Sequence, residues 1–163
     1  MADSEYFAGL DVGGTTVKTV LVDDQGEVVG KMVEVRSHVK DGFEATFRQL
    51  ELALDQLTAA IGISREQVKG IGMDVPAPCC DGVIWGKANL HENLVGINIR
   101  DEFSKRIDGT PVYMTNDGNA AALGEYAVRK KHFGALLLVA PGTGLGGGLV
   151  LPGGRAYEGA NGL

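Results

Sequence analysis

The sequence predicts a mixed α/β fold that opens with an antiparallel meander. Three short runs rich in β-branched and apolar residues, at 6–12, 17–22 and 27–35, are separated by glycine-containing turns, which is the pattern of consecutive strands. A long segment with an apolar stripe at helical spacing follows them. Strand-like and helical segments then alternate, which indicates a mixed sheet with flanking helices.

The first helix is expected to begin at a capping box and to end at a glycine. Asp41, with Glu44 three residues later, resembles a capping box, and Gly62 is suited to a C-cap. Apolar residues between these ends recur at spacings of four and three and predict one buried stripe: Phe43, Phe47, Leu50, Leu54, Leu57 and Ile61.

The middle of the chain predicts a strand, a long loop and a second helix. A fourth strand is expected at 68–75, and the prolines of Pro76-Ala77-Pro78 force an extended exit from it. Residues 79–98 show no clear element, but their apolar content favours an ordered loop in which Trp85 packs. The second helix, capped near Asn98, has one apolar face formed by Ile99, Phe103 and Ile107.

The last third repeats a device seen at the start. A strand at 111–114 leads into a helical segment that opens at Asp117. A buried strand at 135–140, a glycine-threonine turn and a strand at 145–151 then follow the same order as residues 6–22. The similarity is a repeated strand–turn–strand device rather than a short-period repeat.

Composition excludes several classes of function. The 163 residues are enough for one ordinary domain with a substantial core, and the net charge is −6. The only basic cluster is Arg129-Lys130-Lys131, so sequence-independent nucleic-acid binding lacks its electrostatic footprint. No run is apolar and long enough for a membrane span, and residues 1–20 lack a signal-peptide layout. The only cysteines, Cys79 and Cys80, are adjacent and are interpreted as reduced thiols of a cytoplasmic protein.

Asp117 is the first candidate catalytic residue. It stands at a strand-to-helix junction, on the sheet edge where α/β proteins bind ligands. The positive end of the helix dipole favours an ionised carboxylate there, ready to accept a proton from a hydroxyl. The alternative is that Asn116 or Asp117 simply caps the helix.

Two glycine-threonine turns, one on each side of Asp117 in the sequence, predict a clamp for phosphate. In Gly13-Gly14-Thr15-Thr16 and in Gly142-Thr143-Gly144, glycine permits positive φ and leaves backbone N–H groups accessible to an anion. Asp11 stands where it could hold Mg²⁺ through water. Either turn alone could be an ordinary hairpin. Neither turn has the spacing of a P-loop or of a dinucleotide-binding loop.

These residues together resemble the ROK sugar kinases, a family within the actin-like ATPase superfamily. The resemblance covers nearly the whole chain, in order: the first phosphate motif at 11–18, the Pro-Gly-Pro and Asn-Leu sugar loop at 75–78 and 89–90, the catalytic motif at 116–125, the second phosphate motif at 142–148, and the start of the sugar- and zinc-binding region at 157–162. It implies an actin-like (ribonuclease H-like) fold. Residues 1–116 would form the small N-terminal lobe, and 117–163 the beginning of an incomplete second lobe.

The resemblance also implies a reaction, the ATP-dependent phosphorylation of a hexose at its 6-hydroxyl, with glucose the expected sugar. Asp117 would be the general base and Asp11 would hold Mg²⁺ through water. The sugar would be bound at Ala77, Asn89, Asn116 and Asp117. The ATP phosphates would be bound by Gly13, Gly14, Thr15, Thr16, Lys18, Gly142, Thr143 and Gly144. A merely structural role for Lys18 remains open, because it lies within a strand.

The chain departs from the family pattern in three respects. Ala77 replaces the glycine expected between the two prolines, and the tryptophan usual after Asn-Leu is absent. Cys79 and Cys80 stand where the family more often has an apolar pair, and inert buried thiols are expected there rather than redox chemistry. The zinc motif would lie beyond Leu163, so a structural Zn²⁺ is expected only in a longer protein. We therefore expect a fragment, possible homodimers of the intact protein, and little or no activity from these residues alone. The alternative function is a non-catalytic, sugar-responsive regulator of the same family.

Overall fold

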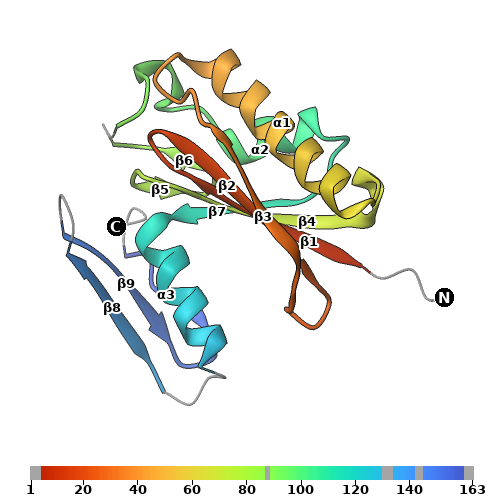
Figure 1. The fold of residues 1–163 in the computed structure, drawn as a ribbon. Coiled ribbons are helices and arrows are strands. Elements are labelled where there is room, and N and C mark those ends of the chain that lie inside the picture. Colours follow the sequence, from red (N-terminus) through yellow and green to blue (C-terminus); the bar gives the residue numbers. More distant parts are fainter. Residues whose placement is uncertain (1–4, 87–88, 130–133, 142–144, 160–163) are drawn as a thin grey trace.

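The computed structural model describes residues 5–86, 89–129, 134–141 and 145–159 (Figure 1). Its main sheet has five strands in the order β3-β2-β1-β4-β7. The first three form the predicted antiparallel meander, while β4 and β7 add in parallel beside β1. The sheet is therefore mixed, as expected. The strand bounds are β1 (Tyr6–Val12), β2 (Thr16–Asp23), β3 (Val28–Arg36), β4 (Val68–Val75) and β7 (Val112–Asn116).

Two helices, α1 (Phe43–Ile61) and α2 (Ile99–Arg106), cover one face of this sheet (Figure 1). Strand residues alternate between the two faces, so every second side chain of β1 and β2 enters the core against α1. The predicted stripe of α1 lies on this core, with Phe47, Leu50, Leu54 and Leu57 buried. The second helix buries Phe103 as expected and is capped by Asn98, whose side chain accepts the Asp101 N–H.

The predicted capping box at the start of α1 is wrong. The N-cap is Gly42, which has φ of 99° and makes no side-chain cap. Asn93, fifty residues away, supplies the missing acceptor, because its Oδ1 receives the Phe43 N–H at 3.0 Å. Asp41 instead pairs with His38. The C-cap prediction is confirmed, since Gly62 adopts the left-handed conformation.

The segment expected to be a long loop contains short elements. Strands β5 (Cys79–Cys80) and β6 (Val83–Ile84) form a hairpin, and η2 (Glu92–Leu94) is a single 3-10 turn capped by His91. A similar turn, η1 (Arg65–Gln67), precedes β4. Trp85 does not pack as expected, because 63% of its surface is exposed.

The chain then forms a second, smaller unit on the opposite side of the main sheet from α1 (Figure 1). Helix α3 (Asp117–Val128) packs on a three-stranded antiparallel sheet of β8 (Leu136–Pro141), β9 (Leu145–Leu151) and β10 (Arg155–Ala156). Ala122, Tyr126 and Val150 form a hydrophobic cluster there, separate from the main core.

The expectation of a buried strand at 135–140 is wrong. Only one face of β8 meets α3, so Leu136 and Leu138 are half-buried while 70% of Leu137 and 59% of Val139 is exposed. A continuous apolar run predicts burial of both faces, but burial requires a second layer, and none covers the outer face within the described residues. In the described part of the chain, no helix is both long enough and apolar enough to cross a membrane.

Candidate active site

Three carboxylates gather at one edge of the main sheet. Asp11 lies near the end of β1 and Asp74 near the end of β4, and the two are register partners in adjacent parallel strands. Asp117 follows β7, whose Thr115 is the register partner of Asp74. Because parallel strands end at the same edge, the fold brings together residues more than a hundred positions apart in sequence.

Asp74 was not recognised in the sequence, and its environment is unusual. Burial raises the pKa of its carboxyl to about 7, and the charges of Asp11 and Asp117 and a hydrogen bond with Asp11 act in the same direction. The only sequence signal was a carboxylate near the end of a strand whose other polar side chain is Lys69. The parallel pairing of β1 and β4 places Asp74 beside Asp11, and this pairing is not visible in the sequence.

The geometry at the start of α3 separates the two capping candidates. Asn116 is the N-cap, and its Oδ1 accepts the Asn119 N–H at 2.7 Å. Asp117 is exposed, and its Oδ1 accepts only the adjacent Gly118 N–H, at 2.8 Å, among the described hydrogen bonds. The amide group of Asn116 is therefore partly used by the helix, whereas the second carboxylate oxygen of Asp117 remains available to a substrate.

The first glycine turn lies beside the predicted sugar loop. The Gly13 N–H donates to the Thr16 carbonyl at 2.8 Å, which closes the turn between β1 and β2. A Cβ atom on Gly14 would lie 3.1 Å from Nδ2 of Asn89. Neither glycine has a positive φ, so the conformational part of the predicted reason for glycine here is wrong, while access of an anion to the backbone stays a prediction. Space for the Asn89 side chain, rather than backbone conformation, favours glycine at position 14.

The remaining predicted residues are placed as follows. Lys18 is exposed and is the cross-strand partner of Asp11, so both side chains project from the same face of the sheet. Ala77 is buried in the main core, which leaves only its backbone for a ligand. Thr15 is exposed and Thr16 is half-buried at the turn. Gly142, Thr143 and Gly144 lie outside the described residues.

A cavity of about 810 Å³ runs along the open face of the main sheet toward α3. Its polar lining includes Asp11, Lys18, Asp74, Thr115 and Glu158. Glu158, also missed in the sequence, accepts a hydrogen bond from the Thr115 hydroxyl at 3.3 Å and so joins the segment after β10 to the end of β7. Burial raises the pKa of the nearby Cys79 thiol to about 11, which keeps it protonated and favours the predicted inert role.

The donor atoms at this edge suit a hard cation. Carboxylate oxygens are the ligands that Mg²⁺ prefers, and it usually takes only one or two of them, with water and phosphate completing its shell. The negative charges of Asp11 and Asp117, strong enough to raise the pKa of Asp74, provide an attractive field. Within the described ranges, no three His, Cys, Asp or Glu side chains are grouped closely enough to hold a metal without such outside ligands.

Comparison with known proteins decides the family. The model of the ROK family matches residues 7–163. The chain belongs to the ROK family. A glucokinase of Halalkalibacterium halodurans is 32% identical to this ROK chain over 162 residues, which are 97% of the chain and 47% of that protein.

Solved structures of ROK proteins share the fold. The polyphosphate/ATP-glucomannokinase of Arthrobacter sp. strain KM superposes with a TM-score of 0.81 at 25% identity, covering 96% of this chain and 62% of that one. A ROK glucokinase of Streptomyces griseus, solved with glucose and AMPPNP, gives 0.80 at 25% identity, covering 97% and 48%. The predicted actin-like fold is confirmed. The chain spans about half the length of the curated relatives it matches.

Proposed function

We propose that the protein carrying this chain phosphorylates the 6-hydroxyl of a hexose, with glucose the expected sugar and ATP the donor. The observation that carries this proposal is that two neighbouring side chains at the start of α3 make different contacts. Asn116 caps the helix, and Asp117 is exposed at the sheet edge with a second carboxylate oxygen that makes no hydrogen bond to the described residues. Such a carboxylate can accept the proton of a sugar hydroxyl as that hydroxyl attacks phosphorus.

Both substrates have plausible partners around this carboxylate. Asn89 and the Nδ2 group of Asn116 would orient the sugar, which reduces the entropy still to be lost at the transition state. The turns at 13–16 and 142–144 would bind the ATP phosphates through backbone N–H groups other than that of Gly13, which donates to the Thr16 carbonyl. Asp11 would hold Mg²⁺ through water, and the ion would neutralise charge that develops on the phosphoryl oxygens. A cytoplasmic location is part of the same proposal.

The test is phosphoryl transfer by the natural protein that carries this chain. A hexose panel and two donors, ATP and inorganic polyphosphate, address the choice of substrates, since the similar Arthrobacter protein is named for both donors. Asp117→Asn keeps the size of the side chain but removes the base, so we expect kcat to fall at least about 100-fold. Asp24→Asn, at an exposed carboxylate on the β2–β3 turn that does not line this cavity, is the matched control and should leave kcat unchanged.

Two outcomes would contradict the assignment. A kcat for Asp117→Asn within tenfold of the wild-type value would show that another group takes the proton. Binding of a hexose without transfer from either donor would favour the alternative of a non-catalytic, sugar-responsive protein. Equilibrium dialysis with labelled sugar distinguishes the second outcome from a failure to bind sugar.

A further inference from the structure

The loop at residues 89–94, whose first residue is a proposed sugar ligand, is tied to the start of α1. Oδ1 of Asn93 accepts the Phe43 N–H at 3.0 Å. Among the described residues, this is the only hydrogen bond from a side chain of the loop to another element. A backbone bond lies on the same side of the loop, where the His91 N–H donates to the Val39 carbonyl at 2.8 Å.

Gly42 makes the side-chain contact possible. As the N-cap of α1 it has no side chain that could accept an N–H of the first helical turn. A Cβ atom on Gly42 would lie 3.1 Å from Nδ2 of Asn93, so glycine also leaves room for the amide group. The Phe43 N–H therefore depends on the loop for its partner, and the loop depends on this N–H for its side-chain attachment to the helix.

The first residue of the same loop lies against the first glycine turn. A Cβ atom on Gly14 would lie 3.1 Å from Nδ2 of Asn89. At the other end of the loop, Leu94 is buried in the main core. Apolar contact is non-directional, so Leu94 holds the loop down without fixing the way the loop faces. The hydrogen bond of Asn93, four positions after Asn89, supplies that direction.

We propose that Asn93 is a positioning residue, which attaches the loop to α1 and thereby aims the amide group of Asn89 at the sugar. This inference rests on the proposed function. Without the Oδ1 acceptor, the Phe43 N–H turns to water and the loop moves relative to the first glycine turn. Asn89 then spends less time in its binding position. Hexose binding weakens, while the proton transfer to Asp117 in the bound complex is unchanged.

The test measures hexose binding by the natural protein that carries this chain. Equilibrium dialysis without ATP uses labelled glucose and then the other hexoses of the panel. Asn93→Ala removes the acceptor, so we expect Kd to rise about tenfold, the effect of losing one hydrogen bond to the sugar. Asn93→Asp keeps an oxygen acceptor for the Phe43 N–H and should bind within about threefold of wild type. At saturating hexose, kcat should stay within about threefold for both variants.

Gln67→Ala is the matched control. The amide oxygen of Gln67 also accepts a backbone N–H at 3.0 Å, that of Ser64. Gln67 immediately precedes β4, so it lies at the opposite end of that strand from Asp74 and the carboxylate edge. Gln67→Ala and Asn93→Ala should lose similar amounts of stability in urea, because each loses one acceptor of a backbone N–H. Only Asn93→Ala should lose hexose affinity, and Gln67→Ala should stay within about twofold of wild type.

Two results with folded variants would overturn the proposal. An Asn93→Ala variant that loses stability but binds hexose within about threefold of wild type would show that Asn93 is only a helix cap. An Asn93→Asp variant that binds hexose as weakly as Asn93→Ala would show that the acceptor for the Phe43 N–H does not decide the affinity.

A measurement on the wild type covers the case in which Asn93→Ala does not fold. Saturation with hexose should slow hydrogen exchange of the Phe43 N–H, because the bound loop keeps Asn93 in place, and should leave exchange of the Ser64 N–H unchanged. Equal exchange of the Phe43 N–H with and without hexose would refute the coupling.

The same measurements separate this inference from the proposed function. A protein that binds a hexose but receives phosphate for it from neither donor contradicts the proposed function alone, because hexose affinity and exchange of the Phe43 N–H still decide the role of Asn93. A protein that binds no hexose contradicts both.

Discussion

At the scale of single residues, Asp74 shows how a fold changes the acidity of a side chain. Asp74 occupies a strand position that faces away from the main core, and its neighbours along β4 on that face are glycines. Burial together with the charges of Asp11 and Asp117 makes ionisation costly, so its pKa rises to about 7. The same residue in the unfolded chain ionises near pH 4.

This pKa difference predicts a dependence of stability on pH. Between about pH 4 and pH 7 the unfolded chain has lost the Asp74 proton and the native protein still holds it. The free energy of unfolding therefore falls as pH rises through this window and levels off above it. Asp74→Asn removes this titrating group. The free energy of unfolding of the variant minus that of wild type should therefore be larger at pH 8 than at pH 5. Urea unfolding without Mg²⁺ at the two pH values measures this.

Asp24→Asn provides the control for that experiment. Its carboxylate is exposed on the β2–β3 turn, outside the cavity that Asp74 lines, so the stability difference from wild type should be the same at pH 5 and at pH 8. An Asp74→Asn variant whose stability difference is also independent of pH would show that Asp74 titrates normally in the native protein.

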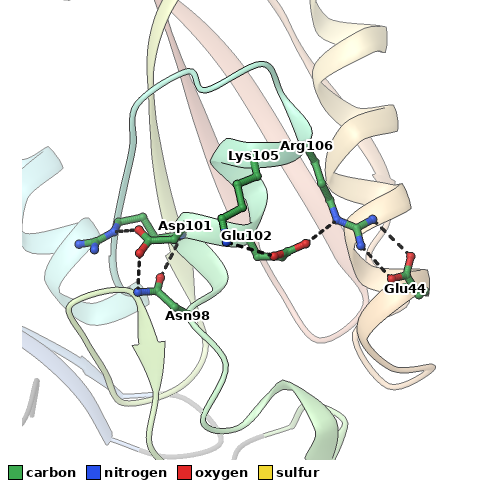
Figure 2. Close-up of polar contacts among 7 residues, drawn as sticks. Glu44, Asn98, Asp101, Glu102, Lys105 and Arg106 are labelled. Carbon is green, nitrogen blue, oxygen red and sulfur yellow. Dashed lines mark hydrogen bonds and ion pairs between the residues drawn. The ribbon is translucent and has the colours of Figure 1, made fainter.

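At the scale of elements, Arg106 joins the two helices that cover the main sheet. From α2 its guanidinium reaches Glu44 of α1 at 2.8 Å and Glu102 of its own helix (Figure 2). It also lies 3.5 Å from Glu51 of α1. The hydrogen bond from Arg106 lowers the pKa of Glu44. The guanidinium also lies over the rings of Phe43 and Phe47, with centroid distances of 5.4 and 4.8 Å. The planar shape of the guanidinium therefore matters here as much as its charge.

Arg106→Lys should consequently destabilise the protein although it keeps the charge. An ammonium group cannot form the two-nitrogen contact with Glu44 or stack flat on both rings. We expect a loss of about 1 kcal/mol in the free energy of unfolding, measured by urea denaturation. Arg129→Lys, in an exposed pair with Glu125 on α3, is the matched control and should change it by less than about 0.5 kcal/mol. Equal effects of the two variants would contradict the stacking role.

At the scale of the whole molecule, the chain builds two hydrophobic clusters of very different size. The larger one lies between the main sheet and the two helices α1 and α2, and the smaller one lies between α3 and the second sheet. The outer face of the second sheet carries the exposed side chains of Leu137 and Val139. Contiguous apolar surface of this kind favours association when nothing covers it.

We therefore predict that the 163-residue chain self-associates through β8. The double variant Leu137→Lys and Val139→Lys should remain monomeric at concentrations where the parent chain forms oligomers, because lysines on an exposed strand oppose pairing. Sedimentation equilibrium at several concentrations measures this. Met32→Lys, at an exposed apolar position on β3, is the control and should leave association unchanged. Oligomers of the double variant as large as those of the parent would exclude this face.

Local patterns in the sequence correctly indicated most elements. The stripe that begins at Phe43 predicted α1, and the glycine at 62 predicted its end, because helical spacing and left-handed backbone preferences act within a few residues. The capping of α1 was mispredicted because the acceptor for the Phe43 N–H is Asn93, which reaches the helix only once the chain has folded. Likewise, the exposure of β8 depends on which layers are present, not on its own composition.

For the candidate site, the sequence by itself determined that a carboxylate follows a strand at position 117 and that glycine-rich segments stand before and after it along the chain. Those features are short and local, and backbone preferences fix them. Only the tertiary structure showed that Asp74 stands beside Asp11, that Asn116 rather than Asp117 caps α3, and that Gly118 meets β9 without a side chain between. The physical reason is that strand pairing and helix packing bring together residues whose separation in sequence carries no trace of their contact.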